Sequence, residues 1–178
     1  MEFREEFMSR NIMRKMAIDS SSAILLLKCG ALEHLLKSCI CIVPESVSCE
    51  LTAPDHEGSG FFLSCFSRGL IEIENGAQVV SGSRKLHRGE RDSISLFVSG
   101  KADYVIIDDG AGAAYCRDSG IPYINALLAV KILRHGGVIS GSDSDEMYSW
   151  LKNNGRYSRH IIEWADAAGV EELAFFLL

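Results

Sequence analysis

The sequence lacks the marks of several large classes of protein. It has no pair of cysteines in a CxxC arrangement, no internal repeat and no low-complexity tract. Its unbroken apolar runs, such as 23–27 and 173–178, fall far short of the roughly 20 residues that span a bilayer. The formal net charge of −6 argues against a protein that coats nucleic acid through general basic charge. A soluble protein with a specific site is expected instead.

The cysteines and the N-terminus indicate the compartment. The first residues, MEFREEF, carry acids where a signal peptide carries a basic region and then an apolar one. We therefore predict a cytoplasmic protein with no membrane association. In a reducing cell, isolated cysteines are expected to be buried free thiols rather than disulfides or zinc ligands. The six cysteines are Cys29, Cys39, Cys41, Cys49, Cys65 and Cys116.

Short apolar runs alternate with helical patterns along most of the chain, which is typical of an α/β fold with a parallel sheet. We expect an N-terminal extension (1–14), one α/β domain (15–140) and a helical C-terminal extension (141–178). Within that extension, 141–146 is expected to be a polar link before the helices. The predicted strands are 15–18, 40–43, 71–73, 104–107 and 121–124. The predicted helices of the domain are 23–36, 45–51, 61–68, 111–118 and 126–135, together with a further helix that begins near Gly89 and Glu90.

Residues 88–109 form the most informative segment, RGERDSISLFVSGKADYVIIDD. Glu90 and Asp92 fall in the first turn of the expected helix, where carboxylates interact favourably with the helix dipole. The uncharged run 104–107 then reads as a strand buried on both faces, and Asp108 and Asp109 follow it. One of these two acids is explained as a helix cap, but the second has no structural explanation.

Acids at strand ends recur elsewhere, at Asp19 after the first strand and at Glu50 on the helix after the second. Because the carboxyl ends of parallel strands meet at one edge of a sheet, these side chains are expected to lie together. Each carboxylate pair repels by about 4 kcal/mol at roughly 4 Å and an effective dielectric of about 20, so such a cluster requires either raised pKa values or a bound cation. Oxygen ligands select Mg²⁺ or Mn²⁺, and such ions promote phosphodiester hydrolysis without a histidine base. Taken singly, Asp19 reads equally well as a helix cap, and Glu50 as part of a solvated face.

The segments MAIDSSSAI, VPESVSCELT, LHRGERDSISLFVSGKADYVIIDD and GIPYINALLAVKILRHGGVIS, in this order, resemble the PIN-domain ribonucleases, most closely their VapC-like branch. The resemblance implies a three-layer α/β/α fold, one or two Mg²⁺ or Mn²⁺ ions, and cleavage of single-stranded RNA. It implies Asp19 as the first acid, with Ser21 beside it, and Glu50 as the second. The third falls on Glu90 or Asp92 and the fourth on Asp108 or Asp109. All six are candidate metal ligands, and the catalytic set is taken as Asp19, Glu50, Asp92 and Asp109.

The chain departs from the family pattern at one place. Relatives carry Gly-Thr after the last strand, whereas this chain has Asn125 and Ala126. We expect Asn125 to hydrogen-bond an aspartate or a substrate phosphate. A basic cluster at Arg84, Lys85, Arg88 and Arg91 is either a solvated surface or a contact for RNA phosphates.

The leading hypothesis is a metal-dependent endoribonuclease that acts on single-stranded or structured RNA, as a toxin or an RNA-processing enzyme. The resemblance implies a homodimer, and an antitoxin or regulatory protein as partner. A phosphatase or phosphoacceptor is disfavoured because Ser21 stands where the acid two positions after Asp19 is required. The remaining alternative is a non-catalytic interaction module that docks through its helical tail.

Overall fold

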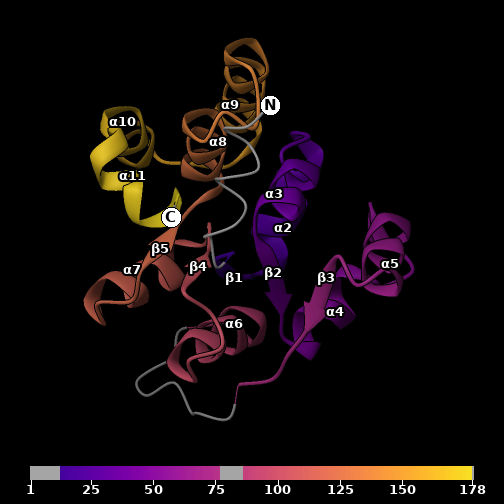
Figure 1. The fold of residues 1–178 in the computed structure, drawn as a ribbon. Coiled ribbons are helices and arrows are strands. Elements are labelled where there is room, and N and C mark those ends of the chain that lie inside the picture. Colours follow the sequence, from indigo (N-terminus) through magenta and orange to yellow (C-terminus); the bar gives the residue numbers. More distant parts are fainter. Residues whose placement is uncertain (1–12, 77–85, 178) are drawn as a thin grey trace.

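A computed structural model describes residues 13–76 and 86–177 (Figure 1). Five strands alternate with helices along the chain. The strands are β1 (Lys15–Ile18), β2 (Ile40–Val43), β3 (Ile71–Ile73), β4 (Tyr104–Ile106) and β5 (Tyr123–Ile124). The helices up to the last strand are α2 (Ser20–Lys28), α3 (Leu32–Ser38), α4 (Glu45–Leu51), α5 (Ser59–Ser67), α6 (Arg88–Val98) and α7 (Gly110–Asp118). Those that follow it are α8 (Ala126–His135), α9 (Gly141–Asn154), α10 (Arg159–Ala167) and α11 (Val170–Leu177).

All neighbouring strands pair in parallel, in the order β3-β2-β1-β4-β5. The central strand β1 pairs with β2 through Met16 and Cys41, and with β4 through Met16 and Tyr104. Because each crossover between parallel strands passes through a helix, both faces of the sheet are covered. The predicted parallel α/β sheet is confirmed.

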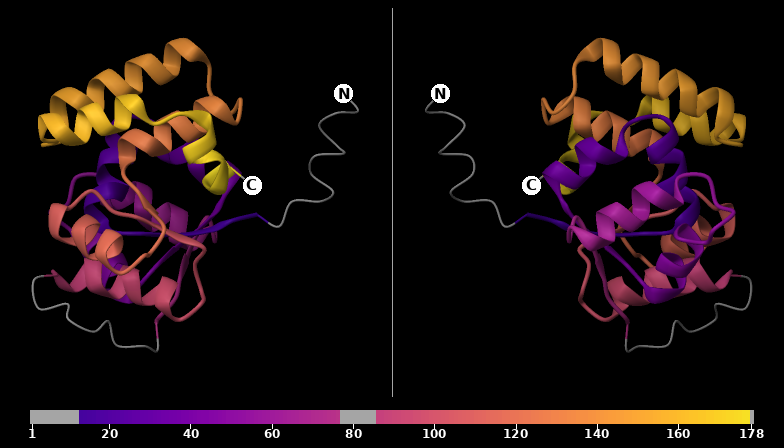
Figure 2. Two further views of the ribbon diagram at one scale, coloured as in Figure 1. Left: turned by 90° about the vertical axis from the view of Figure 1, so that its left-hand side faces the viewer. Right: turned by 90° about the vertical axis from the view of Figure 1, so that its right-hand side faces the viewer.

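The alternation of side chains along β1 separates two apolar cores. Met16 and Ile18 point into a core that also holds side chains of α2, α3, α8 and α9. Ala17 points to the opposite face, into a core with Ile94 of α6 and Cys116 of α7. In the side views of Figure 2, α6 lies on one side of the strands and the C-terminal helices lie on the other. The three-layer α/β/α arrangement is therefore confirmed.

Most predicted elements have the expected position, and α4 and α8 have the predicted bounds. The single helix expected over 23–36 is wrong, because Gly30 adopts a φ of 86° and separates α2 from α3. Left-handed backbone of this kind ends a helix and is readily adopted only by glycine.

The cysteines match the prediction only in part. All six are free, and four of them are buried. Cys29 is partly exposed, and Cys49 is exposed on α4, so the expectation of burial is wrong for Cys49.

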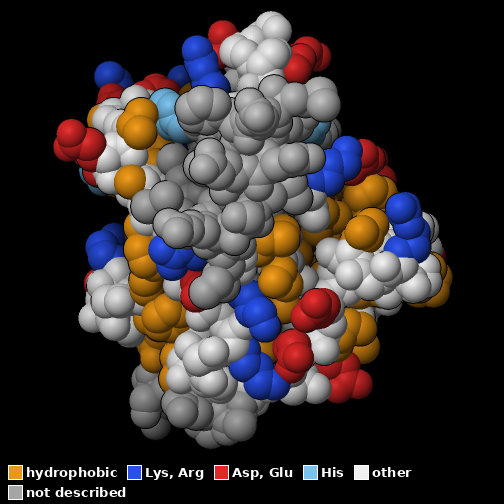
Figure 3. Space-filling model, in the orientation of Figure 1, with side chains coloured by type: hydrophobic (Ala, Val, Ile, Leu, Met, Phe, Trp, Pro, Cys, Tyr) orange, Lys and Arg blue, Asp and Glu red, His pale blue; other side chains and the backbone are white. Residues whose placement is uncertain are grey.

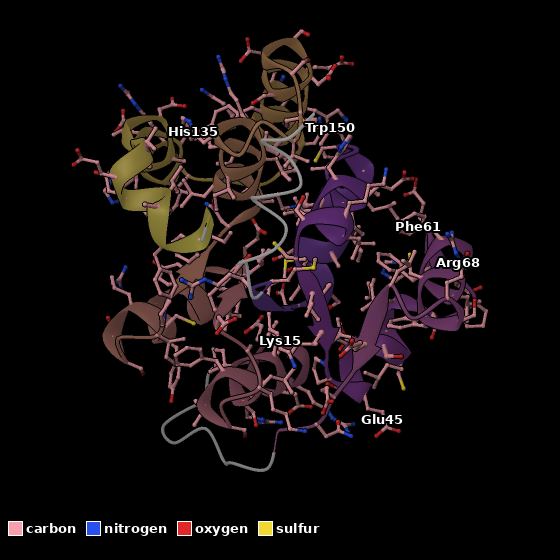
Figure 4. The ribbon with its side chains drawn as sticks, in the orientation of Figure 1. Lys15, Glu45, Phe61, Arg68, His135 and Trp150 are labelled. Carbon is pink, nitrogen blue, oxygen red and sulfur yellow. The ribbon has the colours of Figure 1, made fainter. Side chains whose placement is uncertain are left out.

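The C-terminal helices pack against α8. The Lys131 ammonium donates to the carbonyl oxygens of Ala165 (2.7 Å), Asp166 (3.2 Å) and Ala168 (2.6 Å) at the end of α10. These carbonyls lack partners within the helix, so a cation there both satisfies them and complements the helix dipole. Trp150 of α9 lies beside α2 and α3 (Figure 4), where it lines a groove with Lys28.

The polar link expected over 141–146 is wrong. Those residues form the first turns of α9, because the Ser140 side chain accepts a hydrogen bond from the Asp143 backbone and caps the helix.

Some expectations concern residues that the structure does not describe. The N-terminal extension (1–14) lies outside the described residues apart from its last two, as do Arg84 and Lys85 of the predicted basic cluster. In the ranges 13–76 and 86–177, no helix has the length and apolar character needed to cross a membrane.

The seating of α7 on the sheet generates a stability prediction. A Cβ atom added at Gly112 would lie 2.2 Å from Cδ1 of Ile107, a residue buried in the core, whereas one added at Gly110 would meet nothing within 4 Å. We expect Gly112→Ala to lower the free energy of unfolding by about 1–3 kcal/mol through overpacking. Gly110→Ala should be neutral or stabilising by up to about 1 kcal/mol. Equal urea midpoints for the two variants would contradict this packing.

Candidate functional site

The order in which strands are added reverses at one point of the sheet, between the paired strands β1 and β4. From β1 the chain adds β2 and β3 on one side, and then β4 and β5 on the other. In open α/β sheets, ligands bind in the crevice outside the carboxyl ends of the strands at such a point. Asp19 directly follows β1, and its backbone N–H donates to the Ile106 carbonyl at the end of β4 (3.3 Å). Asp108 and Asp109 lie just beyond, so these three acids share the crevice.

Asp19 is a buried carboxylate that also begins a helix. Its Oδ1 accepts from the Ser22 backbone N–H (2.9 Å) as the N-cap of α2, and its Oδ2 accepts from the Ser21 hydroxyl (2.8 Å). The residue is only 2% exposed. Burial raises its pKa from 3.8 to about 6, and the charge of Asp108 contributes in the same direction, despite the opposing hydrogen bonds.

Asp108 is held by groups from two distant parts of the chain. The Ala126 backbone N–H, at the start of α8, donates to Oδ1 (3.1 Å) and Oδ2 (3.2 Å). The Tyr157 hydroxyl, from the segment between α9 and α10, donates to Oδ1. Burial raises the pKa of Asp108, whereas these hydrogen bonds lower it. Asp108 is thus a desolvated carboxylate beside Asp19.

Asp109 and Glu90 lie at the same edge of the sheet, close enough for the charge of Asp109 to act on Glu90. Asp109 is the N-cap of α7, and its Oδ1 accepts from the backbone of Ala111 (2.7 Å) and Gly112 (3.3 Å). Glu90 lies in the first turn of α6, where its carboxylate accepts from the His87 backbone N–H (3.2 Å). Burial raises the pKa of Glu90, and the charge of Asp109 raises it further.

Glu50, although exposed, approaches this group from α4. Its carboxylate accepts a hydrogen bond from the hydroxyl of Ser20, the residue after Asp19. Its Oε2 lies 3.3 Å from where a Cβ of Gly89 would stand, so the absence of a side chain at Gly89 lets α6 approach α4. The charge of Glu50 is a further cause of the raised pKa of Glu90.

Asp92 lies on another side of α6. Its Oδ2 accepts from the Ser46 hydroxyl in the first turn of α4 (2.7 Å). It also pairs with Arg88 (3.6 Å) and Arg91 (3.8 Å). Of the two acids that the sequence left open on this helix, Glu90 is the one that the structure brings to Asp109 and Glu50.

The two uncharged residues predicted to bind substrate, Ser21 and Asn125, make hydrogen bonds within the protein. The Ser21 hydroxyl binds Asp19. Asn125 is buried as the N-cap of α8, and its Oδ1 accepts from the Leu128 backbone N–H (3.0 Å). The group that contacts Asp108 is instead the neighbouring backbone N–H of Ala126.

Arg88 is the most solvent-accessible basic side chain near the acids. Its side chain is 77% exposed and that of Arg91 is 41% exposed. The face shown in Figure 3 lies on the side of the sheet where the strands begin, and on it basic and acidic side chains are interspersed rather than gathered into one basic surface.

The donor atoms of the crevice suit a hard divalent cation. They are carboxylate oxygens, joined by the Ser22 hydroxyl, which is fully buried and has no hydrogen-bond partner of normal geometry within the described part of the chain. The Ser22 hydroxyl lowers the pKa of both Asp19 and Asp108, so it lies between them. Within the described ranges, no three acidic, histidine or cysteine side chains already form a ligand group. Binding a cation would therefore require some carboxylates to reorient.

Sequence reasoning missed three residues of this site: Ser20, Ser22 and Tyr157. The two serines belong to a run that reads as helix capping, so their contacts with carboxylates have no separate signature. Tyr157 stands 49 positions from Asp108, and nothing in the sequence around it marks the contact.

Comparison with known proteins gives one match. A family model described as a PIN domain matches residues 15–163, which include all five strands and continue through α9 into α10. No curated protein and no solved structure matches the chain.

The buried charge of Asp19 predicts how stability depends on pH without metal. Because the pKa of Asp19 is higher in the folded state, the contribution of this residue to the free energy of unfolding falls as the pH rises from about 4 to about 6, by about 3 kcal/mol in all. Asn preserves the helix cap and removes the charge. In EDTA, we expect Asp19→Asn to raise the free energy of unfolding by up to about 3 kcal/mol at pH 7, and by little at pH 4. A difference from wild type that is independent of pH would contradict this origin.

Proposed function

The chain belongs to the PIN-domain family, a family of nucleases, and on this basis we propose that it is a metal-dependent endoribonuclease. The observation that carries the proposal is the cluster of carboxylates at the carboxyl ends of β1 and β4, where the strand order reverses. Burial raises the pKa of Asp19 and of Glu90; the charge of Asp108 raises that of Asp19 further, and the charges of Asp109 and Glu50 raise that of Glu90 further. A protein with no cation to bind has no physical reason to bury several like charges together.

Mg²⁺ or Mn²⁺ is the cofactor that we propose. Asp19, Glu50, Glu90, Asp108 and Asp109 are the carboxylates that would hold it. When bound, the ion lowers the pKa of a water nucleophile and stabilises negative charge on the scissile phosphate. The geometry supports Glu90 rather than Asp92 as the α6 ligand, because the Asp92 carboxylate is engaged by Ser46 and two arginines.

The other residues act on the substrate and on the acids. Arg88 and Arg91 project from the start of α6 and would contact RNA phosphates, which position a strand without reading its sequence. Ser20, Ser21 and Ser22 donate to, or lie between, the carboxylates and fix their orientation. A role as the toxin of a VapC-like pair or in RNA processing, a homodimer, and binding of an antitoxin or regulatory protein remain predictions from the resemblance.

A second candidate is a non-catalytic interaction module of the same family. It is favoured by the engagement of the acids with serine hydroxyls and backbone N–H groups, and by the absence of a ready ligand group in the described ranges. Metal-dependent stability separates the two, because a ligand that binds only the folded state raises the melting temperature.

We expect purified protein to cleave a mixed pool of single-stranded RNA in the presence of Mn²⁺, and EDTA to abolish the cleavage. Asp109→Asn should lower the rate by at least about 100-fold, more than the loss of an outer-shell partner typically costs. Because Asn also caps helices, the fold should survive this change. Gel analysis of the cleaved pool gives the rate, and circular dichroism checks the fold.

Wild-type cleavage that persists in EDTA, or equal cleavage by Asp109→Asn, would contradict a metal-dependent nuclease. Neither cleavage nor a Mn²⁺-dependent rise in melting temperature would favour the interaction module.

The two acids of α6 are distinguished by a pair of isosteric variants. We expect Glu90→Gln to remove most of the Mn²⁺-dependent rise in melting temperature, since a carboxylate ligand is lost. Gln can still complete the helix cap with His87, so the metal-free protein should remain folded. Asp92→Asn should retain the rise. The reverse pattern would assign the ligand to Asp92 and refute the assignment of Glu90.

A further inference from the structure

Tyr157 is the residue through which the C-terminal extension reaches the acids. It lies between α9 and α10, and its hydroxyl donates to Oδ1 of Asp108. Asp19 is also near enough for its charge to affect the hydroxyl. The extension thus contributes a polar group to the crevice as well as covering the sheet.

The local structure holds the tyrosine ring in place. A Cβ at Gly155 would lie 2.3 Å from Cε2 of Tyr157 and 2.8 Å from the Leu151 carbonyl oxygen, so only glycine fits where the chain leaves α9. The ring packs partly buried against the larger apolar core. Lys131 fixes the far end of α10 to α8. The conformation of the segment between α9 and α10 is therefore restricted, and this restriction holds the Tyr157 hydroxyl in position.

Asp108 accepts hydrogen bonds from two separate parts of the chain. Ala126, at the start of α8, gives its backbone N–H, and Tyr157 gives its hydroxyl. Burial beside Asp108 raises the pKa of Tyr157 above its ordinary range, so the hydroxyl stays protonated and donates. A carboxylate that accepts hydrogen bonds from two fixed donors keeps its orientation. Where such a carboxylate is a metal ligand, its hydrogen-bond donors commonly change the affinity of the protein for the metal.

We propose that Tyr157 is a positioning residue, which orients the Asp108 carboxylate for the divalent cation and so makes the C-terminal extension part of the site. This inference rests on the proposed metal-dependent function. It goes beyond that function, because it assigns the extension a role in binding the ion.

The extension offers a matched control. The hydroxyl of Tyr148 on α9 donates to Oδ1 of Asp166 on α10 (2.9 Å). Asp166 is paired with Lys152 rather than with the acids of the site. Tyr157→Phe and Tyr148→Phe therefore each remove one tyrosine–aspartate hydrogen bond, but only the first touches the crevice.

The test is the affinity of the full chain for Mn²⁺, measured by titration calorimetry with circular dichroism as a check of the fold. We expect Tyr157→Phe to weaken binding by about tenfold, and Tyr148→Phe to leave it within about twofold of wild type. A double-mutant cycle with Asp108→Asn adds a second measurement. In the Asp108→Asn background, the effect of Tyr157→Phe on affinity should disappear.

Several results would overturn the inference. Unchanged or tighter Mn²⁺ binding by Tyr157→Phe, with wild-type binding intact, refutes Tyr157 alone and leaves the proposed nuclease standing. The same holds for equal weakening by both tyrosine variants, or for an effect that persists with Asp108→Asn, because the role would then be structural. Absence of Mn²⁺ binding by the wild type refutes the inference together with the metal-dependent function.

Discussion

The site depends on one constraint, which is the repulsion between carboxylates that meet where the strand order of the parallel sheet reverses. The order β3-β2-β1-β4-β5 forces whatever follows β1 and β4 into one crevice, and in this chain both strands are followed by aspartates. Helix α6 adds Glu90 to the same place, and α4 adds Glu50. The resulting burial raises the pKa of Asp19, Glu90 and Asp108, and the charges of neighbouring carboxylates raise those of Asp19 and Glu90 further. Without a cation, this arrangement costs folding stability.

The protein limits that cost by using the same carboxylates to begin helices. Asp19 caps α2, Asp109 caps α7 and Glu90 completes the cap of α6. Each cap satisfies backbone N–H groups that would otherwise lack partners, and places a negative charge at the positive end of a helix dipole. Each of these carboxylates thus stabilises a helix in the absence of metal, and each remains beside the position that a cation would take.

This double use explains what the sequence predicted and what it did not. The strands, and the acids that follow them, were legible because uncharged β-rich runs ended in aspartates. The choice between Glu90 and Asp92 was not, because both stand near the start of α6 and only the rotation of that helix about its own axis decides which of them faces Asp109. The break at Gly30 was missed because apolar periodicity continues through it. Tyr157 was missed because its contact with Asp108 is set by the packing of α9 and α10 on α8, which leaves no local pattern.

The donors around the acids have a consequence for how a cation would bind. Serine hydroxyls, backbone N–H groups and the Tyr157 hydroxyl already fix several carboxylate oxygens. An oxygen that accepts one hydrogen bond retains a second lone pair, so these contacts orient the acids without excluding metal coordination. Moving a carboxylate toward an ion would cost less if its donors moved with it than if they were lost. Helix α8 and the C-terminal extension hold Asp108 jointly, so the stability of the extension and the geometry of the site are physically linked.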